Sequence, residues 1–249
     1  IGIPITILKV KSDADIAVIE MGANHQKEIE SYCAYTLPTH GLITNCGKAH
    51  LEGFGGEEGV KKGKGELFDY LSANNGIAFI MKDYDYLKEM SSGIGSIFTY
   101  GTYDADITGE IKNSTGFLNV SITKGAVIDT IQTQLVDEYN LPNVLAAVAA
   151  GKYFKVSDDK IKWALENYNP SNSRSQLIEK GSNKFILDAY NANPSSMSHA
   201  VDNIINLKQV DRGVILGDML ELGENSMMYH RLVLQKIRDA KGVISMVIL

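Results

Sequence analysis

The fold is decided by residues 41–80, which read GLITNCGKAHLEGFGGEEGVKKGKGELFDYLSANNGIAFI. Short apolar runs at 41–46 and 77–80 open and close this stretch, and each has the length of a buried strand. Between them lie a glycine-rich stretch, 47–65, and residues 66–71, which we expect to be helical. Strands that alternate with helices favour an α/β fold with a mostly parallel, doubly wound sheet.

The neighbouring segments extend this pattern. Residues 16–19, IAVI, form a β-branched run that predicts a further buried parallel strand, ending at Glu20. Residues 107–135 contain three alternating segments separated by turn signals, which predict an antiparallel meander attached to the main sheet. Asn140-Leu141-Pro142-Asn143 then opens a helix of small apolar residues that we expect to be buried on most sides.

A polar stretch at 169–173, NPSNS, interrupts the pattern after a helix that follows Ser157. Such a break between periodic segments predicts a domain boundary. We therefore expect one domain at residues 1–169 and a second at residues 170–249.

The second part resumes the α/β rhythm. Its expected elements are strands at 185–187, 213–217 and 243–249, and helices that begin at Asn193-Pro194 and at Ser226. We expect the last of these strands to be buried, because residues 243–249 are almost entirely apolar.

Composition excludes several classes of protein. The chain has 249 residues, 24 Lys and Arg, 30 Asp and Glu, and therefore a formal charge of −6, which argues against a non-specific nucleic-acid binder. Two cysteines, Cys33 and Cys46, cannot form a disulfide scaffold and favour a reducing compartment. No apolar run approaches the roughly 20 residues that span a bilayer. An anionic small substrate remains compatible, because local cations act within about 8–10 Å.

The two ends suggest a piece of a longer chain. The sequence begins with Ile1 rather than Met, and it stops inside the apolar run at 243–249. We expect a protein cut at both ends, so the lack of a signal peptide carries no conclusion.

Two polar residues follow expected parallel strands. Glu20 ends the first strand and His50 follows the second, so both would emerge at the rim where open α/β sheets bind ligands. A carboxylate at such a position can hold Mg²⁺. A solvent-facing glutamate and a hydrogen-bonded loop histidine explain the same residues without any ligand.

The glycine-rich stretch permits two interpretations. Its glycines could cradle a phosphate, but the chain contains no G-x-x-x-x-G-K-[ST] motif, and a flexible loop explains them more simply. Lys64 ends the stretch, and by itself it would be a solvated lysine. Two further polar groups of residues follow the expected boundary: Arg174, and the string Asp188-Ala189-Tyr190-Asn191-Ala192-Asn193-Pro194. A ligand site explains Asp188 and Tyr190, while satisfied turn backbone explains Asn193.

Seven motifs, in order along the chain, resemble the Mur ligases, and within them the branch that adds D-alanyl-D-alanine. They are VIEMGANH at 18–25, AHLEGFG at 49–55, KGEL at 64–67, NLPNVLAA at 140–147, NSRSQ at 172–176, DAYNANP at 188–194 and LGDMLELG at 216–223. The resemblance implies that residues 1–169 are most of the central ATPase domain of that family and residues 170–249 the first part of its Rossmann-like C-terminal domain. The family's N-terminal domain and phosphate loop would be missing, so we expect these residues alone to be inactive. Lys27 stands where relatives often carry glycine.

The resemblance also implies roles for individual residues. Glu20 looks like a Mg²⁺ ligand, and His50 looks like a ligand of a second Mg²⁺. Lys64 resembles a lysine that is carbamylated by CO₂ and then helps to hold that second ion. Four residues resemble ATP contacts: Asn143 and Asn140 on the adenine side, Arg174 at phosphate and Asp188 at ribose.

The implied activity is ATP-driven peptide-bond formation through an acyl phosphate. Its substrates would be UDP-N-acetylmuramoyl-tripeptide and D-alanyl-D-alanine, and the protein would act in the cytoplasm as a monomer, without nucleic acid or membrane. Three alternatives stay open: a Mur-type or folylpolyglutamate synthetase-like ligase with another amine substrate, a non-catalytic binding module, and a structural α/β domain. Comparison of amine substrates separates the first from the D-alanyl-D-alanine branch.

Overall fold

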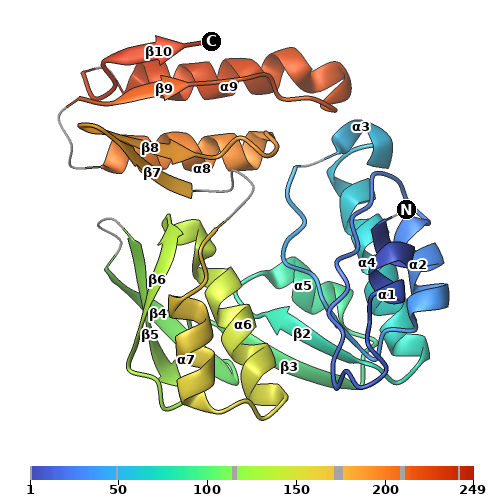
Figure 1. The fold of residues 1–249 in the computed structure, drawn as a ribbon. Coiled ribbons are helices and arrows are strands. Elements are labelled where there is room, and N and C mark those ends of the chain that lie inside the picture. Colours follow the sequence, from blue (N-terminus) through green and yellow to red (C-terminus); the bar gives the residue numbers. More distant parts are fainter. Residues whose placement is uncertain (1, 49, 114–116, 171–175, 208–210, 241) are drawn as a thin grey trace.

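The computed structural model describes residues 2–48, 50–113, 117–170, 176–207, 211–240 and 242–249 (Figure 1). Its helices are α1 (Gly2–Leu8), α2 (Glu28–Thr36), α3 (Leu51–Phe54), α4 (Glu57–Ala73), α5 (Asp85–Met90), α6 (Leu141–Tyr153), α7 (Asp158–Glu166), α8 (Pro194–Asn206), α9 (Ser226–Asp239) and the short 3₁₀ turns η1 (Glu138–Asn140) and η2 (Gly223–Asn225). Its strands are β1 (His40–Leu42), β2 (Ile77–Met81), β3 (Ser96–Gly101), β4 (Ile107–Asn113), β5 (Phe117–Lys124), β6 (Thr130–Val136), β7 (Gln176–Lys180), β8 (Asn183–Leu187), β9 (Gly213–Ile215) and β10 (Met246–Ile248). Within these ranges no helix is both long and apolar enough to cross a membrane.

A six-stranded sheet in the order β1-β2-β3-β4-β5-β6 forms the first half of the molecule. The pairs β1–β2, β2–β3 and β3–β4 are parallel, and β4–β5 and β5–β6 are antiparallel. The expected α/β sheet with an attached meander is therefore confirmed. Helix α5 and strand β3, which complete the parallel part, were not among the elements expected from the sequence.

Helix α6 packs against this sheet and explains its composition. Val144, Leu145, Val148 and Ala149 are all at most 1% exposed, and they pack in one cluster with residues of β2 to β6. Pro142 lies in the first turn, where the missing amide hydrogen costs nothing. Small residues allow this close approach, so the helix is buried as expected.

The expected strand at 16–19 is wrong. These residues form no regular structure, and Val18 is 89% exposed. Among the described residues no strand pairs with them, and β1 pairs only with β2. An apolar run becomes a strand only where a partner satisfies its backbone groups, which explains the difference.

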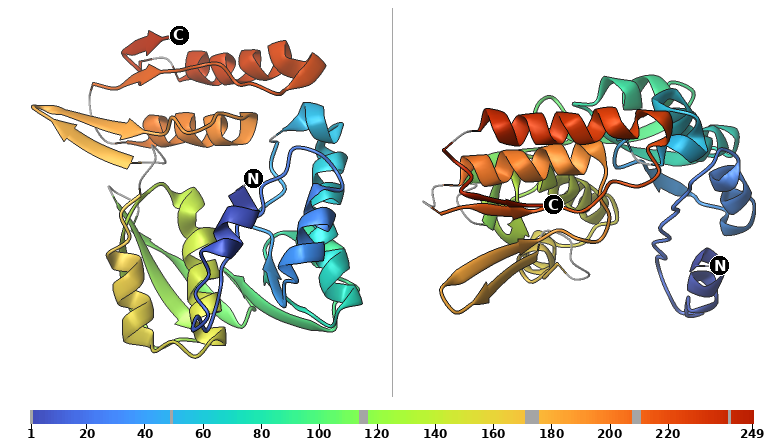
Figure 2. Two further views of the ribbon diagram at one scale, coloured as in Figure 1. Left: turned by 45° about the vertical axis from the view of Figure 1, so that its right-hand side comes forward. Right: turned by 90° about the horizontal axis from the view of Figure 1, so that it is seen from above.

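The second half contains two small sheets with α8 and α9. Strands β9 and β10 are parallel, while β7 and β8 form an antiparallel hairpin. Figure 2 shows α8 and α9 lying side by side along β9 and β10. The expected strand at 185–187 is confirmed as part of β8, whereas the expected burial of residues 243–249 is wrong, because β10 within them is exposed. Among the described residues β10 pairs only with β9, and no other element covers its side chains enough to bury them.

One hydrophobic cluster joins the two halves. Three of its buried residues, Leu51, Phe54 and Val60, come from α3 and α4. The others come from the second half: Val201, Val214, Met219, Leu222, Tyr229, Val233 and Ile237. The second half therefore completes its core with α3 and α4, directly beside His50.

Candidate functional site

Lys64 lies on α4 and faces the loop that leaves the carboxyl end of β1. Its Nζ donates to the carbonyl oxygen of Asn45 at 2.6 Å. The side chain is half-buried, and burial lowers the pKa of the Lys64 amine below its usual range. Lys64 is therefore not the freely solvated lysine that its sequence position allowed, and a larger share of it is in the neutral, nucleophilic form.

Most of the glycine-rich stretch before Lys64 is helical, in α3 and α4, which corrects the interpretation of that part as a loop. A Cβ on Gly59 would lie 1.8 Å from the Phe54 carbonyl oxygen, and one on Gly63 would lie 2.4 Å from the Phe54 ring. These glycines allow α3 to pack tightly against α4. Their role is packing, and they form no phosphate-cradling loop.

His50 precedes α3 in a left-handed conformation, with φ of 54°. Its Nδ1 is hydrogen-bonded to the carboxylate of Glu221, which belongs to the second half of the chain. The Nε2 atom has no hydrogen-bond partner among the described residues. Glu221 lies within the family motif at 216–223, and no role at the site was expected for it from the sequence.

Glu20 lies on an exposed segment that passes close to α3. A Cβ on Gly53 would lie 2.2 Å from the Asn24 carbonyl oxygen, so this segment contacts the helix that follows His50. The amides of Asn24 and His25 donate to Glu28, and these bonds lower the pKa of the Glu28 carboxyl. No hydrogen bond or ion pair among the described residues joins Glu20 to His50 or Lys64.

The segment also explains an unusual residue. Lys27 has a φ of 74°, in the left-handed region where glycine is the easiest residue to accommodate. Its amide donates to the buried carboxylate of Glu66 at 2.5 Å, and the Glu30 amide donates to the same carboxylate at 3.0 Å. Glu66 of α4 thus caps the start of α2 in place of a local capping side chain.

The residues expected at adenine lie together. Asn143 Nδ2 donates to Asn140 Oδ1 at 3.1 Å, and Asn140 Nδ2 donates to the Val136 carbonyl oxygen at 2.8 Å. Asn140 is buried, whereas Asn143 is exposed in the first turn of α6. The inner amide is therefore fixed by the main chain, and the outer amide faces solvent.

Asp188 lies close enough to this region to affect a buried carboxyl there. Asp137 follows β6 with a φ of 84° and is 9% exposed. Burial, followed by the charge of Asp188, raises the pKa of Asp137 to about 7. Asp188 therefore approaches the Asn140 end of α6 from the second half, while Arg174 lies outside the described residues.

The helix start at Asn193 is confirmed. The Asn193 side chain accepts from the amides of Ser195 and Ser196 at 3.1 and 3.0 Å, and Ser196 Oγ accepts from the Asn193 amide. This capping box explains Asn193 by backbone satisfaction alone.

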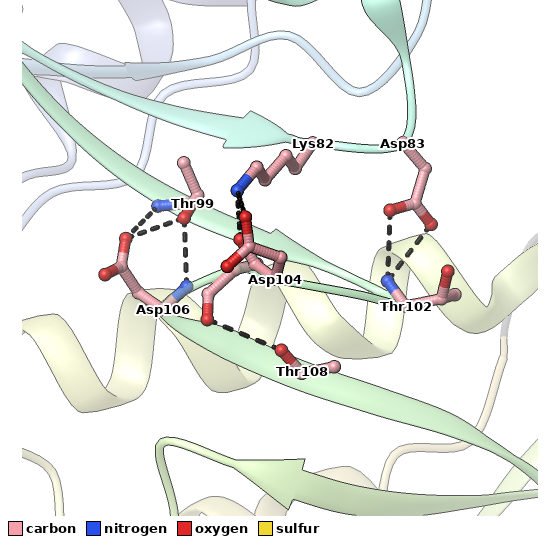
Figure 3. Close-up of polar contacts among 8 residues, drawn as sticks. Lys82, Asp83, Thr99, Thr102, Asp104, Asp106 and Thr108 are labelled. Carbon is pink, nitrogen blue, oxygen red and sulfur yellow. Dashed lines mark hydrogen bonds and ion pairs between the residues drawn. The ribbon is translucent and has the colours of Figure 1, made fainter.

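A second set of polar groups lies at the carboxyl ends of β2 and β3, and its members form hydrogen bonds or ion pairs with one another (Figure 3). Asp83 accepts from the Thr102 amide at 3.1 Å, Asp106 accepts from Thr99 Oγ1 at 2.7 Å, and Lys82 pairs with Asp104. These contacts fasten the connection between β3 and β4, so we assign them a structural role.

The donors near α3 suit Mg²⁺ in part. Glu20 offers carboxylate oxygens and His50 offers Nε2. In the part of the chain that the structure describes, no three His, Cys, Asp or Glu side chains gather closely enough to hold a metal ion. Lys64 supplies a further oxygen donor only as a carbamate, because an ammonium has no lone pair for a cation. That Glu20, His50 and Lys64 meet at metal ions stays a prediction.

Comparisons with known proteins match both halves. Residues 1–151 match the Mur ligase middle domain, and residues 173–247 match the Mur ligase, glutamate ligase domain. The UDP-N-acetylmuramoyl-tripeptide–D-alanyl-D-alanine ligase of Escherichia coli K12 is 36% identical over 92% of this chain and 52% of its own length. The ligase of the same name from Bacillus subtilis 168 is 30% identical over 93% of this chain and 50% of its own length.

Solved structures agree in fold. MurF from Acinetobacter baumannii matches with a TM-score of 0.86 and 26% identity, over 99% of this chain and 58% of that one. MurF from Thermotoga maritima in complex with ADP matches with a TM-score of 0.84 and 22% identity, over 99% of this chain and 61% of that one. The chain spans about half the length of the curated relatives it matches.

Proposed function

The chain belongs to the Mur ligase family, and on this premise we propose that it provides nucleotide and metal contacts of an ATP-dependent peptide ligase. The proposed reaction joins D-alanyl-D-alanine to UDP-N-acetylmuramoyl-tripeptide in peptidoglycan precursor synthesis, as the names of its relatives support. The proposed setting is the cytoplasm, with the protein as a monomer. Residues 1–169 would be the ATP-binding domain and residues 170–249 the C-terminal domain.

One structural observation carries the proposal: Lys64 is withdrawn from solvent onto the loop that leads to His50. Only a neutral amine attacks CO₂, and burial enlarges that fraction of Lys64. The attack forms a nitrogen–carbon bond, and loss of one proton leaves a carbamate. The side chain then changes from a cation to an anion with oxygen donors.

Glu20, His50 and the Lys64 carbamate would hold two Mg²⁺ ions. The ions would supply positive charge that offsets the repulsion between a triphosphate and a carboxylate. The protein's own contribution is to fix these donors: α4 holds Lys64, and the turn before α3 holds His50.

The two halves would share the nucleotide. Asn143 and Asn140 would contact the adenine side, while Arg174 and Asp188 would approach phosphate and ribose from the second half. The tripeptide carboxylate would take the γ-phosphoryl group and release ADP. The dipeptide amine would then attack the acyl phosphate and displace inorganic phosphate. A site shared between two halves excludes water when they close, which protects the acyl phosphate from hydrolysis.

Substitution of Lys64 tests the proposal in the longest natural form of the protein. We expect Lys64→Ala to abolish ADP release that depends on both D-alanyl-D-alanine and the tripeptide substrate. Lys62→Ala, an exposed lysine on the same helix, is the matched control and should retain activity. A ¹³C signal for a lysine carbamate in ¹³CO₂-saturated buffer should be lost only in Lys64→Ala. Undiminished turnover in Lys64→Ala would refute the role. A preference for another amine, such as a single amino acid, would instead redirect the substrate assignment.

A further inference from the structure

We propose that Glu221, from the second half of the chain, positions His50 and sets which imidazole nitrogen is free to bind a metal ion. This inference rests on the proposed function, because it concerns the histidine that would hold Mg²⁺. It adds a positioning residue that lies on the other half of the molecule.

The hydrogen bond decides the form of the imidazole. An ionised carboxylate only accepts hydrogen bonds, so His50 Nδ1 must carry the hydrogen that Glu221 receives. In the neutral ring the lone pair then lies on Nε2. Nε2 has no partner among the described residues, and it is the nitrogen available to a metal. Histidines that bind metals commonly donate the other ring N–H to a carboxylate in this way.

The backbone around Glu221 is anchored independently of its side chain. The Glu52 amide donates to the Glu221 carbonyl oxygen at 3.2 Å. The next residue, Leu222, is 4% exposed and packs in the cluster that contains Leu51 and Phe54. Glu221 itself has a φ of 60°, a left-handed conformation held by these neighbours. The main chain of Glu221 is therefore fixed against α3, and its carboxylate reaches His50 from that position.

The ion pair contributes little to folding. The side chains of His50 and Glu221 are 31% and 51% exposed, and ion pairs with such exposure are screened by solvent and add little to stability. Its effect should fall on the orientation and tautomer of His50. Because Glu221 reaches His50 only when the second half is seated on α3, docking of the two halves and metal binding become linked.

Mn²⁺ binding in the longest natural form of the protein tests this role, with electron paramagnetic resonance as the readout. Loss of a carboxylate behind a metal-binding histidine typically weakens metal affinity about 10–100-fold. We expect Glu221→Ala to weaken Mn²⁺ binding by that factor and Glu221→Gln, whose amide oxygen still accepts, to weaken it less. Glu224→Ala, an exposed glutamate three residues later, is the matched control and should bind Mn²⁺ as the parent does.

A second measurement is independent of the metal. Nitrogen-15 spectra of histidine, assigned with His50→Gln, should show hydrogen on Nδ1 in the parent and in Glu224→Ala. In Glu221→Ala the hydrogen should shift to Nε2 in part of the population, while the melting temperature stays unchanged.

The outcomes separate the two levels of inference. If His50→Gln weakens Mn²⁺ binding but Glu221→Ala changes neither affinity nor tautomer, the positioning role is overturned and the proposed ligase site stands. If His50→Gln leaves Mn²⁺ binding intact, the metal role of His50 in the proposed function is overturned, and the role of Glu221 falls with it.

Discussion

The two halves of the molecule bury their apolar residues in different ways. The buried residues of the core of the first half all lie between Ile43 and Ile161, so the first half supplies its own buried core. The core of the second half includes Leu51, Phe54 and Val60, which the first half supplies. The second half thus relies on α3 and α4, and the residue just before α3 is His50. The apolar contact that stabilises the second half also fixes the approach of Glu221 to the candidate site.

The largest expected effect comes from substituting one buried phenylalanine in each core. Phe54 is 4% exposed in the shared cluster, and Phe68 is 1% exposed in the self-contained one. Each change to alanine should cost about 3–5 kcal/mol of stability. By hydrogen exchange, we expect Phe54→Ala to deprotect α8 and α9 and Phe68→Ala to deprotect β2 and α6. Full protection of α8 and α9 in Phe54→Ala would show that the second half does not depend on the shared cluster.

A second contact between the halves is electrostatic and unfavourable. Burial and then the charge of Asp188 raise the pKa of Asp137 from 3.8 to about 7. Between about pH 4 and pH 7 the folded state therefore holds a proton on Asp137 that the unfolded state has released. The free energy of unfolding decreases as pH rises through this range. We expect Asp137→Asn to raise the free energy of unfolding at pH 8 relative to pH 4, by at most about 4 kcal/mol.

Denaturant titrations across that pH range measure this effect. Asp69→Asn, which replaces an exposed carboxylate on α4, is the control and should leave the pH profile unchanged. A profile for Asp137→Asn that parallels the parent would mean that the pKa of Asp137 is not raised in the folded protein. The contact between Asp137 and Asp188 would then not oppose docking of the halves.

The sequence predicted elements whose determinants are local. Asn193 caps α8 through its own neighbours, and the alternation of apolar and polar residues in β5 follows from one buried and one more open face. The expected strand at 16–19 failed because a strand depends on a partner, which a local pattern does not contain. Glycines 59 and 63 were interpreted as part of a loop, although both lie in a helix. The reason for glycine there is the tight tertiary contact with Phe54, which the local sequence does not reveal.

The same distinction applies to the candidate site. Resemblance to a family predicted Lys64 and His50 as site residues, and in the structure Lys64 donates to the carbonyl oxygen of Asn45, in the loop before His50. Glu221 was missed because its contact crosses 171 positions of sequence and depends on how the halves dock. A positive φ at Glu221 and a buried Leu222 beside it become informative only once the fold is known.

The smallest expected effect compares two glycines on α4. A Cβ on Gly63 would lie 2.4 Å from the Phe54 ring, whereas one on Gly65 would meet only Met90 Cε at 3.4 Å. Gly63→Ala should therefore push α3 away and cost about 1–3 kcal/mol. Gly65→Ala should gain up to about 1 kcal/mol, because alanine favours the helix. Thermal unfolding measures both. Equal changes in stability for the two variants would contradict the tight packing of Phe54 against α4. They would also contradict the fixed position of His50 beside Glu221, which depends on that packing.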